Sequence, residues 1–217
     1  QHGALSITNV TELGTVYTPD ETAALSKAAK SAGMGVHLDG ARFANALVSL
    51  GCTAAEMTWK AGVDAVSFGG TKNGLMGVEA VVIFDPEKAW EFEMRRKRAG
   101  HLFSKHRFLS AQMESYLEDD LWLNLARHSN AMGRRLSDGI TRLPSAKLTH
   151  PTQANMVFAS WPRAGHRNAL DNGANYYLWP RTETLSGPGH QPVAARLVTC
   201  WSTTASDIDC FLEQIKA

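Results

Sequence analysis

An excess of charge of one sign is absent from this 217-residue chain, in which 22 lysine and arginine residues are balanced by 21 aspartate and glutamate residues, for a formal net charge of +1. A net charge so close to zero gives no general reason to expect binding to nucleic acid or to an acidic membrane surface. Long hydrophobic runs are absent too, and no apolar stretch approaches the roughly 20 residues that cross a bilayer. We therefore predict no nucleic-acid partner and no membrane span.

Cysteine is scarce. The three cysteines, Cys52, Cys200 and Cys210, are odd in number and their spacing matches no metal-ligand motif. We predict reduced thiols in a cytoplasmic protein, with no metal site. The N-terminus has no signal-peptide pattern, although the chain starts at Gln1 and opens as the middle of a domain would.

Short apolar strands alternate with amphipathic helices over the first 84 residues. The pattern predicts strands at residues 4–9, 36–39, 65–68 and 78–84, and helices at 18–32, 42–50 and 54–60. Such alternation is typical of an α/β layer with a mostly parallel sheet. Ligands of these sheets gather beyond the carboxyl ends of the strands.

The pattern changes after residue 86. Residues 87–143 are predicted to be helical, with a break near 100–104 and then one long helix whose apolar positions suit a buried face: Leu109, Met113, Tyr116, Leu117, Leu121, Leu125 and Met132. Strands at 146–150, 154–161, 175–179 and 195–201 and a helix at 205–216 then predict a small α+β domain. We place the first domain at residues 1–120, and the connecting helix with the small domain at 121–217.

One lysine follows a predicted strand directly. Residues 65–74 read AVSFGGTKNG, a short apolar strand that ends in a glycine turn with Lys72 just beyond it. We expect its amine to be partly desolvated there, which favours the neutral form and frees a lone pair for attack on a carbonyl group. The alternative is a surface lysine in an ordinary turn.

A carboxylate and a guanidinium mark the end of the preceding strand. Residues 35–42 read GVHLDGAR, which places Asp39 and Arg42 at the same kind of position as Lys72. A lysine that forms an imine and an acid that holds a ring nitrogen protonated fit pyridoxal 5′-phosphate. Asp39 could instead cap the helix that follows. His37, two residues earlier, points to the same side of the strand, either supporting the carboxylate or serving as a core histidine.

Four ordered motifs carry a resemblance to a known family: HLDGARFANAL, SFGGTKNG, RRKRAGHLFSKHRFLSAQ and ARLVT. Together they resemble the threonine aldolases, of the low-specificity L-threonine type, within the β-eliminating lyase family of pyridoxal-phosphate enzymes. The resemblance implies an α/β, aminotransferase-like (type I) large domain and a small α+β C-terminal domain. It also implies that the N-terminal part of the large domain, with the phosphate loop and the catalytic base, lies outside this chain. The 217 residues alone are therefore expected to bind the cofactor weakly and to turn over poorly.

The resemblance implies retro-aldol cleavage of a β-hydroxy-α-amino acid, such as threonine, allo-threonine or phenylserine, to glycine and an aldehyde. Lys72 would carry the Schiff base and Asp39 would support the ring, while Arg42 and Arg196 would bind the substrate carboxylate. The implied cofactor-binding set contains Lys72, Asp39 and Arg42 together with three further residues: Thr71, Lys105 and Arg107. Lys105 or Arg107 would reach into a neighbouring subunit's site, in a homodimer or homotetramer with shared active sites.

Three alternatives stay open. Another type I pyridoxal-phosphate enzyme, such as a β-eliminase or an aminotransferase, would share the acid and the lysine. A catalytically silent fragment that acts only in assembly belongs to a different class. The basic run Arg95–Arg98 could also be a solvated helix face, and nucleic-acid binding ranks last because the domain has no net basic charge.

Overall fold

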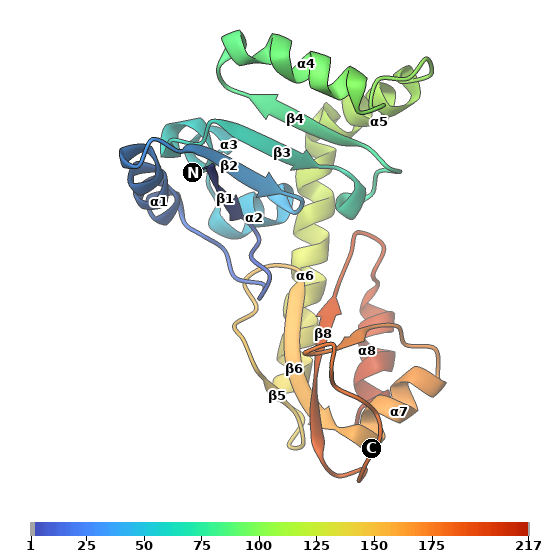
Figure 1. Cartoon of the computed structure of the whole chain (residues 1–217). Helices are drawn as coiled ribbons and strands as arrows, with labels where there is room; N and C mark the ends of the chain where they lie inside the picture. Colours follow the sequence, from blue (N-terminus) through green and yellow to red (C-terminus); the bar gives the residue numbers. More distant parts are fainter. Residues whose placement is uncertain (1–2, 217) are drawn as a thin grey trace. The chain divides into compact units, whose positions relative to one another are not determined.

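The computed structural model describes residues 3–216 and divides into two compact units (Figure 1). Among these residues, the first unit comprises 3–10 and 16–125, and the second comprises 11–15 and 126–216. The boundary falls inside helix α6 (Leu121–Thr141). None of the described helices combines the length and the hydrophobicity that a membrane span requires.

The first unit is built on a four-stranded sheet in the order β1-β2-β3-β4. Strands β1 (Ala4–Thr8), β2 (Gly35–Gly40) and β3 (Ala65–Gly69) run parallel, and β4 (Glu79–Ile83) is antiparallel to β3. The prediction of a mostly parallel sheet in an α/β layer is confirmed. All three parallel strands end at one edge of the sheet, which is the edge where ligands bind in such folds.

Strand β2 is covered on one face and half-open on the other. Along β2, Val36 and Leu38 are buried while His37 and Asp39 are half-buried on the opposite face, as the period of two in a strand requires. Helices α1 (Pro19–Ser31) and α2 (Phe43–Leu50) contact β2. Helix α3 (Ala54–Met57) and the 3-10 turn η1 (Trp59–Ala61) follow α2. The polar sheet face therefore stays accessible within this unit.

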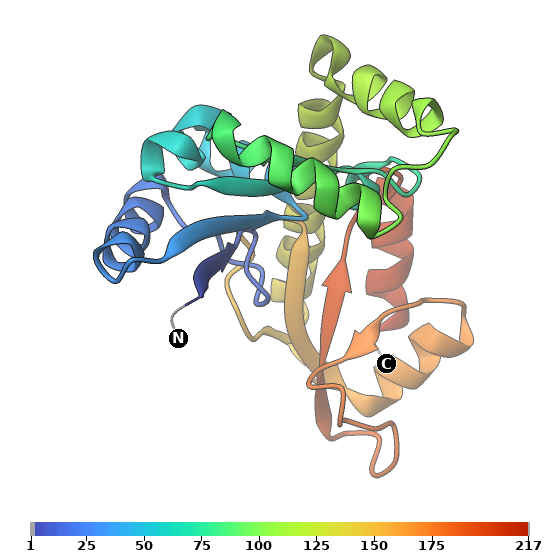
Figure 2. The ribbon, with the colours of Figure 1, turned by 45° about the horizontal axis from the view of Figure 1, so that its top comes forward.

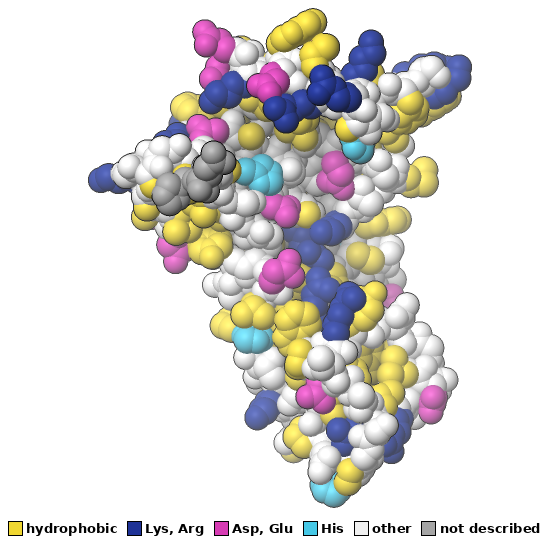
Figure 3. Space-filling model, in the orientation of Figure 1, with side chains coloured by type: hydrophobic (Ala, Val, Ile, Leu, Met, Phe, Trp, Pro, Cys, Tyr) yellow, Lys and Arg dark blue, Asp and Glu magenta, His cyan; other side chains and the backbone are white. Residues whose placement is uncertain are grey.

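Two helices follow β4 and the short turn η3 (Pro86–Lys88): α4 (Ala89–Arg98) and α5 (Arg107–Leu117). Their ribbons lie on the β4 side of the sheet in Figures 1 and 2. Helix α4 has no buried residue, and over it Figure 3 shows hydrophobic side chains at the surface beside lysine and arginine side chains. Trp90, at its start, is 69% exposed.

The prediction of one long helix from about residue 105 to 143 is wrong. The helix is interrupted at the 3-10 turn η4 (Glu118–Asp120), where Asp119 and Asp120 adopt left-handed backbone angles with φ of 49° and 56°. Aspartate tolerates this conformation better than most residues, which lets the helix end there. Leu117 and Leu121, which flank the break, are exposed and do not belong to a buried helical face.

The second unit contains an antiparallel sheet in the order β5-β6-β8-β7. Its strands are β5 (Lys147–Leu148), β6 (Met156–Pro162), β7 (Tyr177–Leu178) and β8 (Pro192–Val198). Every residue of β6 up to Trp161 is buried, in a core shared with α6 and α8 (Ala205–Gln214). Helix α7 (Arg163–Asp171) was not predicted from the sequence.

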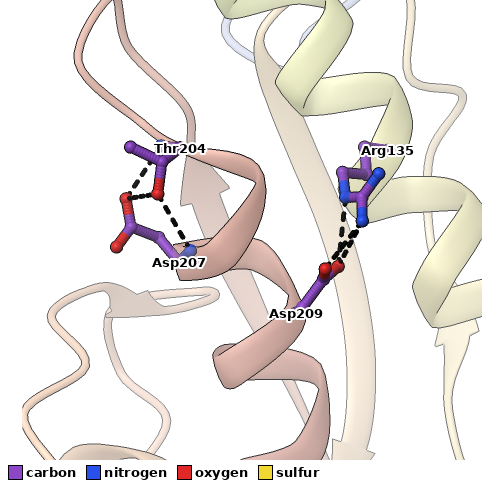
Figure 4. Close-up of polar contacts among 4 residues, drawn as sticks. All are labelled: Arg135, Thr204, Asp207 and Asp209. Atoms are coloured by element: carbon purple, nitrogen blue, oxygen red, sulfur yellow. Dashed lines mark hydrogen bonds and ion pairs between the residues drawn. The ribbon is translucent and has the colours of Figure 1, made fainter.

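Polar contacts fix the position of α8 in the second unit (Figure 4). Thr204 caps the helix by accepting a hydrogen bond from the Asp207 backbone, and the Asp207 carboxylate accepts from the Thr204 backbone in return. Asp209 accepts hydrogen bonds from the guanidinium of Arg135 on α6, the shortest at 2.7 Å. The capping box defines where α8 begins, and the ion pair joins it to α6.

Candidate active site

The structure brings Asp39 and Lys72 to the same edge of one sheet. Asp39 is the penultimate residue of β2, and Lys72 lies in the 3-10 turn η2 (Thr71–Asn73), which begins two residues after β3 ends. Strands β2 and β3 are hydrogen-bonded neighbours that run parallel, so both residues lie at the carboxyl end of the layer. This is the arrangement that the two motifs predicted.

Glycines allow the two strand ends to approach backbone to backbone. A Cβ atom at Gly69 would lie 2.6 Å from the carbonyl oxygen of Ala41, and a Cβ atom at Gly40 would lie 2.7 Å from the carbonyl oxygen of Ser67. Neither separation is compatible with a side chain. The Asp39 loop and the Lys72 turn are therefore held next to each other by residues that must be glycine in this geometry.

Asp39 does not cap the following helix. Its Oδ1 atom accepts a hydrogen bond from the Ala41 backbone N–H at 3.0 Å, within its own turn. The N-cap position of α2 is Arg42, which makes no side-chain capping bond. The capping alternative for Asp39 is therefore wrong, and its half-buried carboxylate remains at the ligand edge of the sheet.

Lys72 is an exposed residue in the structure, although the sequence predicted partial desolvation of its amine. Within the described residues this expectation is wrong, because the side chain of Lys72 stays exposed. An exposed amine can still form a covalent bond with a carbonyl compound.

The turn around Lys72 is anchored on both sides. On the preceding side, the carboxylate of Glu79 accepts hydrogen bonds from the backbone N–H groups of Gly70 at 3.2 Å and Thr71 at 3.3 Å. The Thr71 hydroxyl donates to the Val78 carbonyl oxygen at 3.3 Å. On the following side, the side chain of Asn73 is buried and hydrogen-bonded.

The predicted carboxylate-binding arginines lie in different units, and each is described within its own. Arg42 is half-buried, three residues after Asp39 in the first unit. Arg196 lies on β8 in the second unit, where one Nη atom contacts the sulfur of Met156 at 3.3 Å. The Nε atom of Arg196 is buried and has no hydrogen-bond partner among the described residues. A guanidinium with an N–H donor that lacks a hydrogen-bond acceptor among the described residues is suited to bind an anion.

Lys105 lies just before α5, and Arg107 is its first residue. Both are exposed, and the guanidinium carbon of Arg107 lies 4.9 Å from the ring centroid of Phe108. His37 is bonded across the sheet, to the Ser6 hydroxyl at 2.9 Å and the Ser67 hydroxyl at 2.8 Å. Its partners are hydroxyl groups on the neighbouring strands β1 and β3.

Sequence reasoning missed the residues that hold the lysine turn: Asn73, Glu79 and Tyr116. Glu79 opens a strand and could have been noticed as a charge at a strand end. Asn73 precedes Gly74 and suggests only a turn, and Tyr116 was expected to be an ordinary core residue.

Comparisons with known proteins show what the whole chain resembles. A low specificity L-threonine aldolase from Pseudomonas sp. (strain NCIMB 10558) is 40% identical over 213 residues, which cover 98% of this chain and 59% of that protein. A second one, from Pseudomonas aeruginosa, is 41% identical over 199 residues, which cover 92% of this chain and 55% of that protein. The chain therefore spans rather more than half the length of these relatives.

A solved structure of a threonine aldolase has a similar fold. The threonine aldolase from Leishmania major superposes on 99% of this chain and 60% of that one, with a TM-score of 0.84 and 29% sequence identity. A family model described as "Beta-eliminating lyase" matches residues 1–161. Because this match covers well over half of the sequence, the chain belongs to the β-eliminating lyase family.

Proposed function

We propose that the protein uses pyridoxal 5′-phosphate to cleave a β-hydroxy-α-amino acid of the threonine, allo-threonine or phenylserine type to glycine and an aldehyde. The observation that carries the proposal is that Asp39 and Lys72 lie at the carboxyl ends of two neighbouring parallel strands. The names of the two Pseudomonas relatives support the choice of reaction. Family membership supports the reaction class.

The chain's residues fit such a cofactor. Lys72 has an accessible amine on an anchored turn, and Asp39 has a half-buried carboxylate at the end of the neighbouring strand. Lys72 would hold the cofactor by a covalent bond from Nζ to the aldehyde carbon, and Asp39 would keep the ring nitrogen protonated. When bound, the cofactor would supply the electron sink that lets the Cα–Cβ bond of the substrate break.

The remaining predicted residues have supporting roles in this proposal. Arg42 and Arg196 would bind the substrate carboxylate and so orient the bond that breaks, and the unsatisfied Nε atom of Arg196 supports this. Thr71 would contact the cofactor from the turn that holds Lys72.

We also propose a cytoplasmic homo-oligomer, either a dimer or a tetramer. Lys105 and Arg107 would then reach a neighbouring subunit's cofactor. Their exposure supports this, as do the exposed side chains of Trp90, Phe103 and Phe108 in the same segment.

The decisive experiment replaces the lysine in the native protein. With cofactor added, the unsubstituted protein should show a visible absorption band, and borohydride should fix the cofactor on the peptide that contains Lys72. Lys72→Ala should lose both the band and the glycine released from threonine. Lys27→Ala, an exposed lysine on α1, is the matched control and should lose neither.

The same assays separate the alternatives. Transamination of an amino acid without release of glycine from threonine would favour an aminotransferase. Absence of the band in the unsubstituted protein would contradict the proposal and would favour a silent assembly fragment.

A further inference from the structure

The residue after Lys72 attaches the lysine turn to the body of the first unit. Asn73 is only 3% exposed, and its side-chain nitrogen donates to the Tyr116 hydroxyl at 2.5 Å and to the Trp122 carbonyl oxygen at 2.9 Å. The two acceptors lie 43 and 49 residues further along the chain. A primary amide has two N–H donors, so both are used to fix the turn.

Tyr116 is a rigid partner for this attachment. It is fully buried on α5, with its ring centroid 6.0 Å from that of Phe68, the residue before the end of β3. Burial raises the pKa of Tyr116 to about 12, and the charge of Glu79 acts in the same direction. The hydroxyl therefore stays protonated at neutral pH and accepts the Asn73 hydrogen bond as a neutral group.

The aromatic ring of Tyr116 belongs to a cluster beneath the turn. Phe68 also contacts Phe43 and Trp122, with centroid separations of 5.6 Å and 5.5 Å. Phe43 and Trp122 are stacked on each other at 6.3 Å. The acceptors of Asn73 are therefore part of a packed group that also contains the start of α2, the helix that follows the Asp39 loop.

Lys72 lies between two fixed points. Glu79 holds the backbone of Gly70 and Thr71, while Asn73 is tied to Tyr116 and Trp122. The lysine side chain itself is exposed. The structure thus immobilises the backbone on both sides of the lysine and leaves only its side chain free to move.

We propose that Asn73 and Tyr116 are positioning residues for Lys72, and that their hydrogen bond aims the lysine amine at the aldehyde of the cofactor. This inference rests on the proposed function. In the step concerned, Nζ attacks the aldehyde carbon, a C=N bond replaces the C=O bond, and one water leaves with the carbonyl oxygen and the two amine hydrogens. Fixing the backbone beforehand lowers the entropy that this bimolecular approach costs.

A purely structural role makes a different prediction. A buried hydrogen bond that only supports the fold would lower the unfolding temperature when removed, and below that temperature it would leave the rate of C=N bond formation unchanged. The rate measured well below unfolding therefore distinguishes the two roles.

The test uses Tyr116→Phe, which removes one hydroxyl and keeps the ring, and Asn73→Ala, which removes both hydrogen bonds. The matched control is Tyr176→Phe, which removes a comparable hydroxyl, 3.0 Å from the Nδ1 atom of His166 in the second unit. The cofactor-free native protein is mixed with pyridoxal 5′-phosphate. The visible band is followed in time, and borohydride trapping at Lys72 gives the yield. Amide hydrogen exchange over residues 70–74 reports the mobility of the turn.

One hydrogen bond contributes a net factor of about 2 to 12, so Tyr116→Phe should slow C=N bond formation by that amount. Asn73→Ala should slow it further and accelerate exchange in the turn, while Tyr176→Phe should change neither. Unchanged rates in both site variants would overturn this inference alone. No band in the unsubstituted protein would overturn the proposed function and this inference together.

Discussion

The two units of the chain use their sheets in opposite ways. In the second unit, β6 is buried along its length up to Trp161 and forms the centre of a closed core. In the first unit, β4 is open on both faces, with Val81 46% and Val82 40% exposed. The second sheet contributes mainly its faces to a core, whereas the first contributes mainly its strand ends to a site.

The difference explains why the lysine and the acid of the proposed site lie in the first unit. A strand that is buried on both faces needs mainly apolar side chains. Strand β6 therefore has few positions at which a polar side chain could serve a site. Parallel strands that end together can present polar groups without breaking a core, as Asp39 and Lys72 do. The price is an open edge, where Lys72 is exposed and the turn must be anchored by Glu79 and Asn73.

The largest expected effect is on the closed core. Trp161 is fully buried and stacks on His166 with ring centroids 3.9 Å apart, so Trp161→Ala should cost about 3–5 kcal/mol of unfolding free energy. Trp90→Ala removes the same side chain from the open surface of α4 and should cost less than about 0.5 kcal/mol. Denaturant unfolding of both variants tests the contrast. Equal losses would show that the first unit is as closed as the second.

A smaller effect, confined to the site, is expected at Gly69. Gly69→Ala places a methyl group against the Ala41 backbone and should cost about 1–3 kcal/mol, because the two strand ends must separate. Formation of the covalent link at Lys72 should slow in parallel. The matched control is Gly35→Ala, at the start of β2, where the nearest atom to the new methyl group is 3.8 Å away. A normal rate of link formation in Gly69→Ala would contradict the close approach described for this edge.

The smallest effect is a pH dependence restricted to the second unit. Burial lowers the pKa of His166 from its ordinary value of 6.5, while its ring bonds to Val193 and Tyr176. The unfolded chain then binds more protons than the folded one below that pH. Stability is therefore complete above about pH 6.5 and decreases as the pH falls through this value.

Amide hydrogen exchange between pH 7.5 and pH 5.5 measures the pH dependence of stability separately in each unit. Protection of β6 and β8 should fall on acidification, and His166→Gln should reduce the slope. His190→Gln, an exposed histidine of the same unit, should leave the slope unchanged. A slope that survives in His166→Gln would assign the pH dependence to other groups.

Local sequence signals predicted the site edge well. Strand periodicity and the glycines after each strand placed Asp39 and Lys72 at neighbouring strand ends, because both signals depend on residues within a few positions. The break at Asp119 was missed because the flanking leucines keep helical spacing through three consecutive acidic residues. Helix α7 was missed because its buried residues include Arg163 and His166, which do not form an apolar stripe.

The anchoring of the lysine turn could not be predicted for a different reason. Asn73 and Tyr116 are 43 residues apart, and nothing in either local pattern indicates the other. The exposure of Lys72 also depends on which elements cover the sheet edge, and periodicity carries no information about that. Pairings of this kind become visible only once the chain is folded.

Strand β4 has one more consequence for anyone handling this chain. It is the last strand in the order β1-β2-β3-β4, so among residues 3–216 its outer side has no neighbouring strand. Its alternate N–H and C=O groups on that side can template a further strand, and Glu79 is the one charged residue along its five positions. Concentrated solutions of this polypeptide should therefore self-associate by strand addition, and a lysine introduced at Val81 should act as a gatekeeper against aggregation.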